Sequence, residues 1–293
     1  MASEIRIPRR LSEPAEAHPE RGRWLEALPA RVEELLAEWE LELGAPFDHA
    51  GTAAWVAPAV AAGGEELVLK LGWRHFEAEH EAEGLRTWAG DGTVRLLGAR
   101  RFDDAVALLI ERCVPGTSLK LALGEPEQDL VIAALLRRLW AHAPEAGNPF
   151  RSLGTLCAYW GTAWAEDLEG TPVAGDRGLE REALSLLREL PASADREVLL
   201  CTDLHAENVL SAEREPWLVI DTKPFLGDPA FDAVQHMLNC ERRLAADPGA
   251  LADRMANLLD LDGERVRRWL FVRCAQEGRR EPRLLEAARR LAP

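Results

Sequence analysis

The 293-residue sequence lacks features that would place it in several common protein classes. No apolar run approaches the roughly 18 residues that a membrane-spanning helix needs, and the charged, proline-bearing N-terminus has no apolar signal-peptide core. The five cysteines are odd in number, widely spaced and without a CxxC pair, which argues against a disulfide framework or structural zinc site. These absences predict a cytoplasmic protein with reduced thiols and no membrane partner.

Positive charge is also scarce, since 35 Lys and Arg against 50 Asp and Glu give a formal net charge of −15. Nucleic-acid binding draws on clustered Lys and Arg, so this balance argues against a nucleic-acid partner. An acidic protein suits a cationic ligand better, although acidity can equally serve solubility alone. Aromatic residues are few apart from ten Trp, most of which we expect in hydrophobic cores.

The predicted elements divide the chain at Pro115-Gly116, a pattern break that suggests a hinge. Before it, the patterns predict helices over 24–43 and 75–89 and strands over 53–60, 66–71, 93–97 and 105–111. After it, helices predominate, over 126–142, 153–168, 178–190, 229–245, 248–260, 263–278 and 281–291. A chain of this length has room for about two domains, so we predict an α+β fold with two lobes, residues 1–113 and 114–293. Residues 1–23 are expected to form a mobile or loosely docked arm.

The most informative stretch is VLLCTDLHAENVLSAEREPWLVIDTKP, residues 198–224. Asp203 and Asn208 fit the pattern D-x-x-x-x-N, and a predicted hairpin over 209–220 ends at Asp221. Its apolar strands can be anchored in a core, so we expect these three polar residues to converge. Phosphoryl transfer needs one carboxylate to orient the attacking hydroxyl, and amide and carboxylate oxygens to bind Mg²⁺. We expect Asp203 to be the base and Asn208 and Asp221 to be the metal ligands; the alternative is a polar turn on a surface hairpin.

A second pattern lies in the first half, where ELVLKL places Lys70 inside an apolar strand, as in the V-A-I-K signature. A lysine there can pair with nucleotide phosphates if a carboxylate on the next helix holds it, and Glu81 and Glu83 are both candidates. Alternatively, Lys70 is an edge-strand charge and the acidic helix a solvated face. The order of lysine strand, acidic helix, Pro-Gly break and D-x-x-x-x-N…D favours a phosphotransferase over coincidence.

At these residues the chain resembles the aminoglycoside phosphotransferases, which are relatives of the protein kinases. The resemblance is strongest to the branch of streptomycin 6-phosphotransferases and hydroxyurea phosphotransferase-type resistance kinases. It runs from about Phe47 to Arg273 and is carried by LVLKLG, LLIERCVPGTSL, LLCTDLHAENVL, WLVIDTKPFLGDPAFDAVQHMLNC and RWLFVRC. It implies a protein-kinase-like fold, with a nucleotide-binding lobe over 1–113 and a helical lobe over 114–293 that holds the catalytic loop and the acceptor cleft.

The resemblance also implies an activity, the transfer of the γ-phosphate of ATP or GTP, held with Mg²⁺, to a hydroxyl of a small molecule. A cationic aminoglycoside, streptomycin first, is the leading acceptor, and hydroxyurea or another metabolite is the alternative. A nucleotide-binding pseudokinase scaffold is a third hypothesis, which the retained catalytic residues argue against. A monomer is expected.

Each matching residue takes an implied role. Lys70 falls on the nucleotide-binding lysine, and Glu81, in HEAE, falls on its helix partner. Thr52 lies in the loop 51–54 that covers the phosphates in the family, although no G-x-G-x-x-G is present. Glu111 and Cys113 fall on the hinge whose backbone meets the adenine. The base and magnesium roles fall on the three residues of the 198–224 stretch already assigned to them.

Two motifs depart from the family pattern. Cys201-Thr202-Asp203 stands where many relatives have His-Gly-Asp, and Asp221-Thr222-Lys223-Pro224 stands in place of Asp-Pro-Lys-Pro. Both keep the residue that bears the chemistry. The departures therefore bear more on substrate identity than on activity.

Four residues are candidate acceptor contacts: His205, Asp228, His236 and Asn239. Each has a structural alternative. His205 can hydrogen-bond the loop backbone. Asp228 can cap the following helix, and Asp232 can brace the catalytic loop. His236 and Asn239, three residues apart on one helix face, can be satisfied interior polar residues.

Overall fold

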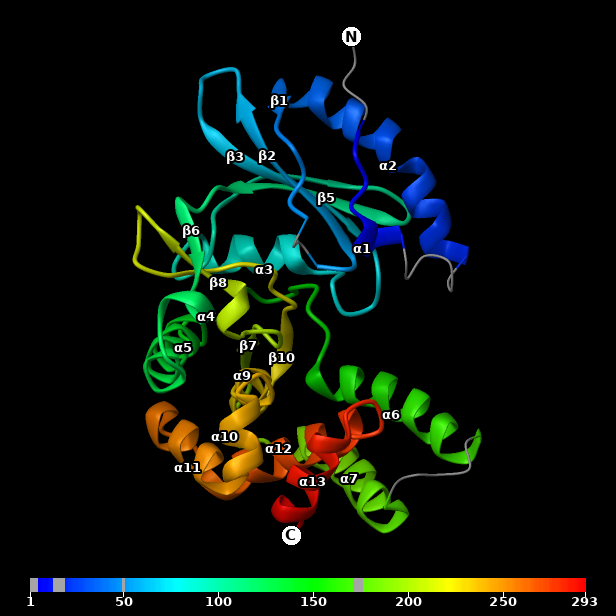
Figure 1. Cartoon of the computed structure of the whole chain (residues 1–293), viewed down its shortest axis with the longest axis vertical. Coiled ribbons are helices and arrows are strands. Elements are labelled where there is room, and N and C mark those ends of the chain that lie inside the picture. The colour runs from blue at the N-terminus through cyan, green and yellow to red at the C-terminus, as the bar shows by residue number, and fades with distance from the viewer. Residues whose placement is uncertain (1–4, 13–18, 49–50, 171–175) are drawn as a thin grey trace. The chain divides into compact units, whose positions relative to one another are not determined.

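The computed structural model describes residues 5–12, 19–48, 51–170 and 176–293. The chain divides into two compact units, Met1–Val114 and Pro115–Pro293, at the Pro-Gly break (Figure 1). None of the described helices is both long enough and apolar enough to cross a membrane.

The first unit is built on a five-stranded antiparallel sheet with the strand order β1-β2-β3-β5-β4. The strands are β1 Leu41–Leu43, β2 Ala54–Ala61, β3 Glu66–Trp73, β4 Leu96–Arg101 and β5 Ala105–Glu111. The helices are α1 Arg9–Ser12, α2 Pro19–Glu38 and α3 Glu81–Trp88. Strand β3 is central, so Lys70 lies between Val56 of β2 and Leu108 of β5 rather than on a sheet edge.

Helix α2 and the sheet share one hydrophobic core. The helix repeats apolar residues at helical spacing, and Trp24, Leu28 and Leu35 are fully buried. Leu69 and Leu71 of β3 are equally buried and belong to the same core. The alternation of β3 places Lys70 on the opposite side of the strand from these two leucines.

The expectation of a loosely docked N-terminal arm is wrong for its described part. Ile5 and Ile7 pack against the core of the first unit, and Leu11 is buried in it. The backbone carbonyl of Arg6 accepts a hydrogen bond from Trp55 Nε1 at 2.9 Å. Apolar residues spaced among charges therefore bind this segment to the core; residues 1–4 and 13–18 lie outside the described part of the chain.

Several predicted boundaries are also wrong. The helix predicted over 24–43 ends at Glu38, because Glu40 takes a left-handed φ of 51°, and the alternating residues 41–43 form β1. The helix predicted over 75–89 is shortened to α3, and the strand predicted over 93–97 is β4, displaced toward Arg101. The single helix predicted over 229–245 is three helices, with non-helical backbone at Cys240 before the last of them.

The second unit contains two small sheets and is otherwise helical. The sheets are β10-β7 and β6-β8-β9, formed by β6 Pro115–Ser118, β7 Val198–Leu200, β8 Val209–Ala212, β9 Leu218–Val219 and β10 Phe225–Gly227. The helices are α4 Leu119–Ala122, α5 Glu125–Leu139, α6 Leu153–Gly170, α7 Arg177–Glu189, α8 Pro229–Asp232, α9 Val234–Leu238, α10 Glu241–Ala246, α11 Pro248–Leu259, α12 Gly263–Glu277 and α13 Pro282–Leu291. The described residues of this unit also include two short 3₁₀ helices, Pro191–Ser193 and Ala206–Asn208.

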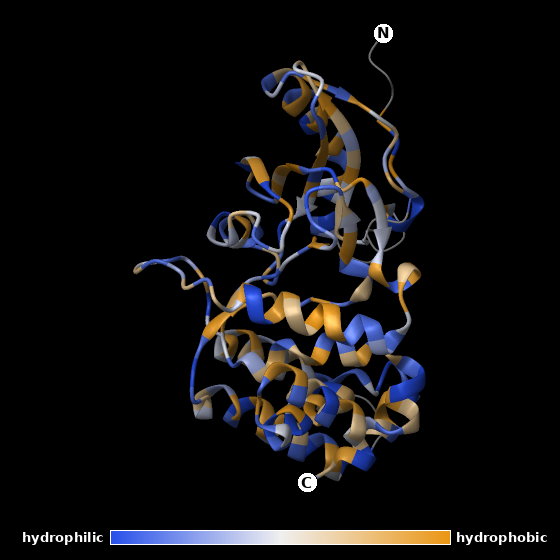
Figure 2. Cartoon of the chain, turned by 90° about the vertical axis from the view of Figure 1, so that its left-hand side faces the viewer, coloured by the Kyte–Doolittle hydropathy of each residue, from blue (hydrophilic) through white to orange (hydrophobic). Residues whose placement is uncertain are grey.

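Helix α12 is the centre of this unit. It packs against α7, α11 and α13, and Trp269, Leu270, Phe271 and Val272 are all fully buried. Four consecutive buried residues cover every side of a helix, which identifies an interior helix. Helices α7 and α13 each bury only one face, and Figure 2 shows hydrophobic and hydrophilic residues alternating along the helices of this unit.

The carboxylate of Asp129, in α5, ties four helices together. It is fully buried and accepts hydrogen bonds from His236 Nε2 of α9 at 3.0 Å, Arg243 Nη1 of α10 at 2.9 Å and Arg254 Nε of α11 at 2.6 Å. Burial alone would raise the pKa of Asp129, but the hydrogen bonds from His236, Arg243 and Arg254 outweigh it and lower the pKa to about 2. Asp129 is therefore a charged anchor for this part of the fold.

Strand β10 passes very close to the start of α6. A Cβ atom added to Gly227 would lie 2.4 Å from the Cβ of Leu153, and Leu226 N donates to the carbonyl of Arg151 at 2.9 Å. Both atoms in the first contact are attached to backbone, so neither can rotate away. The close approach fixes β10, and with it the paired strand β7.

We predict that Gly227→Ala lowers the free energy of unfolding by about 1–3 kcal/mol, because the added methyl group forces β10 and α6 apart. Gly161→Ala, in α6, is the matched control. Its Cβ would meet only ordinary contacts at 3.6 and 3.7 Å, so a helix-favouring methyl should be neutral or stabilising. Urea unfolding of the two variants compares them, and equal stabilities would contradict the account.

We also predict an acid-dependent contribution from Asp129. Its folded-state pKa is depressed from an ordinary 3.8 to about 2, so its stabilisation is present above pH 4 and lost as the pH falls toward 2. The stability advantage of the native chain over Asp129→Asn should shrink by about 2 kcal/mol across that window. Asp253→Asn, which removes a half-exposed carboxylate paired with Arg267, should show no comparable change. If the difference in free energy of unfolding between the native chain and Asp129→Asn stays constant from pH 4 to pH 2, the predicted role of the Asp129 charge is refuted.

Candidate active site

The first unit holds a buried ion pair between Lys70 of β3 and Glu81, the first residue of α3. Lys70 Nζ lies 2.7 and 2.8 Å from the two carboxylate oxygens, and the two side chains are 9% and 8% exposed. Each charge would be costly to bury alone, so each keeps the other ionised and in place. Glu83 is instead a more exposed partner of Arg86 at 3.8 Å. The structure thus selects Glu81 from the two candidates.

Three further residues of this unit were expected near the nucleotide. Thr52 is exposed in the bend before β2, and the neighbouring Gly51 has open space where a Cβ would stand. Glu111 ends β5, where its carboxylate accepts a hydrogen bond from Arg95 N at 3.0 Å. Cys113 is half-buried next to the boundary of the unit. Their roles stay predictions that rest on the family resemblance.

In the second unit, Asp203, Asn208 and Asp221 lie on one loop and hairpin. Strand β7 leads into the loop 201–205, and β8 and β9 form the predicted hairpin. Asn208 Nδ2 donates to the carbonyl of Asp203 at 3.0 Å, and Ile220 N donates to the carbonyl of Asn208 at 2.9 Å. The second bond brings Asp221 beside Asn208. The structure therefore gathers the three residues at one end of the hairpin.

The loop backbone is strained at two positions. Thr202 and Asp221 have φ values of 52° and 56°, in the left-handed region that β-branched residues in particular avoid. Asp232, which is fully buried, holds the first of them by accepting hydrogen bonds from Cys201 N at 2.9 Å and Thr202 N at 2.6 Å. Trp140 Nε1 donates to the same carboxylate at 2.9 Å. The structure thus supports the bracing role for Asp232.

Negative charge accumulates around this loop. Burial and the carboxylates of Asp232, Asp203 and Asp221 raise the pKa of the Cys201 thiol well above its usual range, so the thiol is neutral. Burial lowers the pKa of His205 although Asp203 lies nearby, which favours a neutral imidazole. A cluster of carboxylates around neutral groups is suited to a divalent cation with oxygen ligands.

Lys223 is a residue that the sequence reasoning missed. Its Nζ lies 2.6 Å from Asp203 Oδ2, and the two side chains are 24% and 17% exposed. Its backbone is tied to the same loop, because Lys223 N donates to the carbonyl of Cys201 at 3.0 Å and Thr202 Oγ1 donates to the carbonyl of Lys223 at 2.6 Å. The signal lies in the motif Asp221-Thr222-Lys223-Pro224, where the lysine follows two residues after the predicted metal ligand.

The candidate acceptor residues His205, His236 and Asn239 share one hollow of about 250 Å³, formed within the second unit. The remaining lining comes mainly from α4, α5 and the loop that holds Asp203: Lys120, Leu123, Gly124, Glu125, Gln128, Ala206, Glu207 and Arg242. His205 also accepts a hydrogen bond from Glu207 N at 3.4 Å, so it contributes to the loop backbone as well as to the hollow.

Asp228 is a structural residue, and its expected contact with substrate is wrong. Its Oδ1 accepts a hydrogen bond from Ala230 N at 3.0 Å and caps α8. Its Oδ2 accepts from Trp269 Nε1 at 2.6 Å and from Arg265 Nε at 2.5 Å. With only 3% of the residue exposed, the carboxylate is committed to these three donors.

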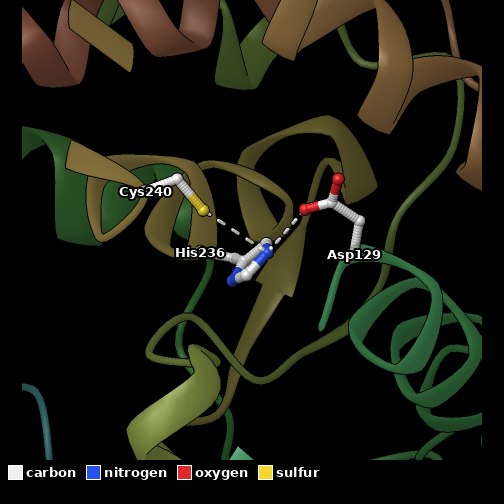
Figure 3. Close-up of side chains that lie close together, drawn as sticks. All are labelled: Asp129, His236 and Cys240. Carbon is white, nitrogen blue, oxygen red and sulfur yellow. Dashed lines mark hydrogen bonds and ion pairs between the residues drawn. The ribbon is translucent and has the colours of Figure 1, made fainter. Parts of the chain in front are cut away.

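Asp129, His236 and Cys240 form a buried group whose atoms could in principle surround a metal ion (Figure 3). The chemistry of the donors does not fit one. Asp129 Oδ1 accepts hydrogen bonds from His236 Nε2 and Arg243 Nη1, and Oδ2 accepts one from Arg254 Nε, so the carboxylate is already engaged. The guanidinium groups of Arg243 and Arg254 already neutralise the Asp129 carboxylate. The group is therefore a hydrogen-bonded network rather than a metal site.

Residues 42–283 match the model of a family described as aminoglycoside/hydroxyurea antibiotic resistance kinase. Hydroxyurea phosphotransferase from Kitasatospora aureofaciens is 39% identical over 261 residues, which span 86% of this chain and 73% of the relative. Streptomycin 6-kinase from Streptomyces griseus is 33% identical over 280 residues, 93% of this chain and 89% of the relative.

Two solved structures share the fold. Aminoglycoside phosphotransferase APH(3'')-Id from Streptomyces rimosus, in complex with ADP and streptomycin, has a TM-score of 0.56 at 19% identity and covers 85% of this chain and 98% of its own. Choline kinase LicA from Streptococcus pneumoniae has a TM-score of 0.61 at 14% identity, with coverage of 90% and 98%. The predicted protein-kinase-like α+β fold is confirmed. The family model and the relatives together show that the chain belongs to the aminoglycoside/hydroxyurea antibiotic resistance kinases.

Proposed function

We propose that this protein transfers the γ-phosphoryl group of ATP, or of GTP, to a hydroxyl of a small cationic acceptor, with streptomycin as the leading acceptor. The observation that carries the proposal is the gathering of Asp203, Asn208 and Asp221 at one end of the β8–β9 hairpin. The buried Lys70–Glu81 pair supports it from the first unit.

On the donor side, Lys70 would bind phosphate oxygens of the nucleotide while Glu81 holds its ammonium group in place. Asn208 and Asp221 would bind Mg²⁺. Their donor set fits the ion, because Asn208 Nδ2 is engaged with Asp203 O and leaves the amide oxygen as a ligand, and Asp221 adds a carboxylate. When bound, the ion supplies charge neutralisation at the phosphates.

On the acceptor side, the hydroxyl oxygen of the acceptor would bond to the γ-phosphorus, and Asp203 would receive the hydroxyl proton. The bond between the γ-phosphorus and the oxygen that bridges it to the β-phosphate would break at the same time. Lys223 Nζ, at 2.6 Å from Asp203 Oδ2, fixes the direction of this side chain before substrate binds. The same ammonium group is then available to the transferring phosphoryl group. The two side chains would act as one unit.

The identity of the acceptor is supported by the relatives. Streptomycin 6-kinase from Streptomyces griseus matches over 89% of its own length, which favours streptomycin. Hydroxyurea is the second candidate, because the hydroxyurea phosphotransferase from Kitasatospora aureofaciens has the higher identity of the two, 39% against 33%. Both acceptors fit the same reaction, and the mass of the phosphorylated product distinguishes them.

The proposal predicts a phosphorylated product when the purified chain is incubated with ATP, Mg²⁺ and streptomycin, detected by mass spectrometry alongside hydroxyurea and other aminoglycosides. Asp203→Asn should reduce turnover about 100- to 10,000-fold, because it removes the proton acceptor while keeping the side-chain shape. Glu83→Gln, which removes a half-buried carboxylate that does not contact Lys70, is the control and should retain native turnover. Nucleotide binding without transfer to any acceptor would favour a pseudokinase and overturn the proposal.

A further inference from the structure

Trp140, which follows the last residue of α5, is linked to the loop 201–205 through one buried carboxylate. Its indole Nε1 donates to Asp232 Oδ2 at 2.9 Å, and only 9% of the residue is exposed. The same Oδ2 accepts a hydrogen bond from Cys201 N at 2.9 Å, while Oδ1 accepts one from Thr202 N at 2.6 Å. Three N–H groups therefore share the two oxygens of a carboxylate that is fully buried.

The loop 201–205 needs this support because of its own sequence. Thr202 is β-branched and has a φ of 52°, a conformation that glycine adopts freely and that other residues keep only when their surroundings enforce it. Asp203 follows directly, and its backbone N donates to the carbonyl of Cys201 at 2.8 Å. The direction of the Asp203 side chain thus depends on the backbone segment that Asp232 holds.

This hydrogen-bonding pattern requires Asp232 to be ionised. A carboxylate accepts hydrogen bonds at both oxygens, whereas a carboxylic acid turns one oxygen into an O–H donor. Since the three surrounding groups are all N–H donors, a proton on Asp232 would face one of them and break its hydrogen bond. Burial raises the pKa of Asp232 to about 6, and the hydrogen bonds from Trp140, Cys201 and Thr202 oppose that rise. The indole N–H therefore favours the ionised form near neutral pH.

The neighbouring titratable groups do not take over this task. Within the described residues, no Lys, Arg or His side chain forms an ion pair with Asp232, whose hydrogen bonds come from one indole and two backbone amides. Burial and nearby carboxylates keep the pKa of the Cys201 thiol well above its usual range, so this thiol is neutral. Arg265 of α12 binds Asp228, at the start of α8, instead of Asp232. The charge of Asp232 is thus stabilised by hydrogen bonds.

We infer that Trp140 is a positioning residue: its indole N–H, acting through the carboxylate of Asp232, holds the backbone of the loop 201–205 in the conformation that presents Asp203. This inference rests on the proposed function, because the loop affects turnover only if Asp203 is the base. It makes turnover depend on the ionisation of a group outside the reaction. Since Asp232 is protonated below its pKa, kcat should fall as the pH drops through about 6.

Trp140→Phe tests the inference because it keeps an aromatic ring and removes the N–H. With the full chain, ATP, Mg²⁺ and streptomycin, the fall in kcat should begin about one pH unit higher than in the native chain, the effect of one lost hydrogen bond to a charged group. At pH 6 this is a loss of about fivefold, whereas kcat at pH 8 and both KM values should stay within about twofold.

Trp164→Phe is the matched control. Trp164 is also buried, but its Nε1 has no hydrogen-bond partner among the described residues, so its pH profile should coincide with that of the native chain. A loss of kcat that is equal at every pH in Trp140→Phe would indicate a merely structural role and overturn the inference. An unchanged pH profile in Trp140→Phe would overturn it as well.

NMR of the native chain labelled with ¹³C and ¹⁵N decides the matter even if Trp140→Phe does not fold. The carboxyl carbon of Asp232 should titrate at about pH 6, and the amide protons of Cys201 and Thr202 and the indole proton of Trp140 should move with it. N–H signals that stay in place while Asp232 titrates, or an Asp232 that stays ionised from pH 8 to pH 5, refute the inference. Signals that move together without phosphorylation of any acceptor would support the loop contact and refute the proposed function, so the two failures are distinct.

Discussion

The buried carboxylate of Asp232 is the constraint on which the arrangement of the site depends. It receives the backbone N–H groups of Cys201 and Thr202 and the indole N–H of Trp140. Burial raises the pKa of Asp232 to about 6, while hydrogen bonds from Trp140, Cys201 and Thr202 oppose that rise. These bonds offset the left-handed backbone at Thr202, a conformation that costs on the order of 1–3 kcal/mol. The loop that presents Asp203 is therefore held by hydrogen bonds to a side chain outside the chemistry.

Buried carboxylates that position a neighbouring group occur elsewhere in the protein. Glu81 positions Lys70 in the first unit, and Asp129 positions His236 in the second. In each case a carboxylate shielded from solvent fixes the direction of a neighbouring polar side chain. Buried ion pairs contribute little net stability when compared with well-packed apolar residues. Their value here is geometric, since they hold polar atoms where flexible surface side chains would not.

Much of the fold and of the candidate site could be predicted from the sequence, because the patterns that identify strands, turns and motif residues are local. Strand β5 and the hairpin that separates Asn208 from Asp221 follow directly from apolar patterns and turn residues. The docking of Ile5 and Ile7, the breaks within 229–245 and the bonds from Arg265 and Trp269 to Asp228 could not, because they depend on residues distant in sequence. The same holds for Lys223, whose ion pair with Asp203 forms only when the loop and the hairpin fold together. Local patterns find elements and motifs, while tertiary contacts decide which polar residues remain available.

The central claim is that Asn208 and Asp221 form a cation site beside the proposed base. Crystals of the full chain grown with ADP and Mn²⁺, a magnesium substitute with an anomalous signal, test it directly. The account predicts an anomalous peak at bonding distance from the Asn208 amide oxygen and the Asp221 carboxylate, with Asp203 next to it. A peak bound by other residues, or bound ADP with no metal at these two side chains, would contradict it.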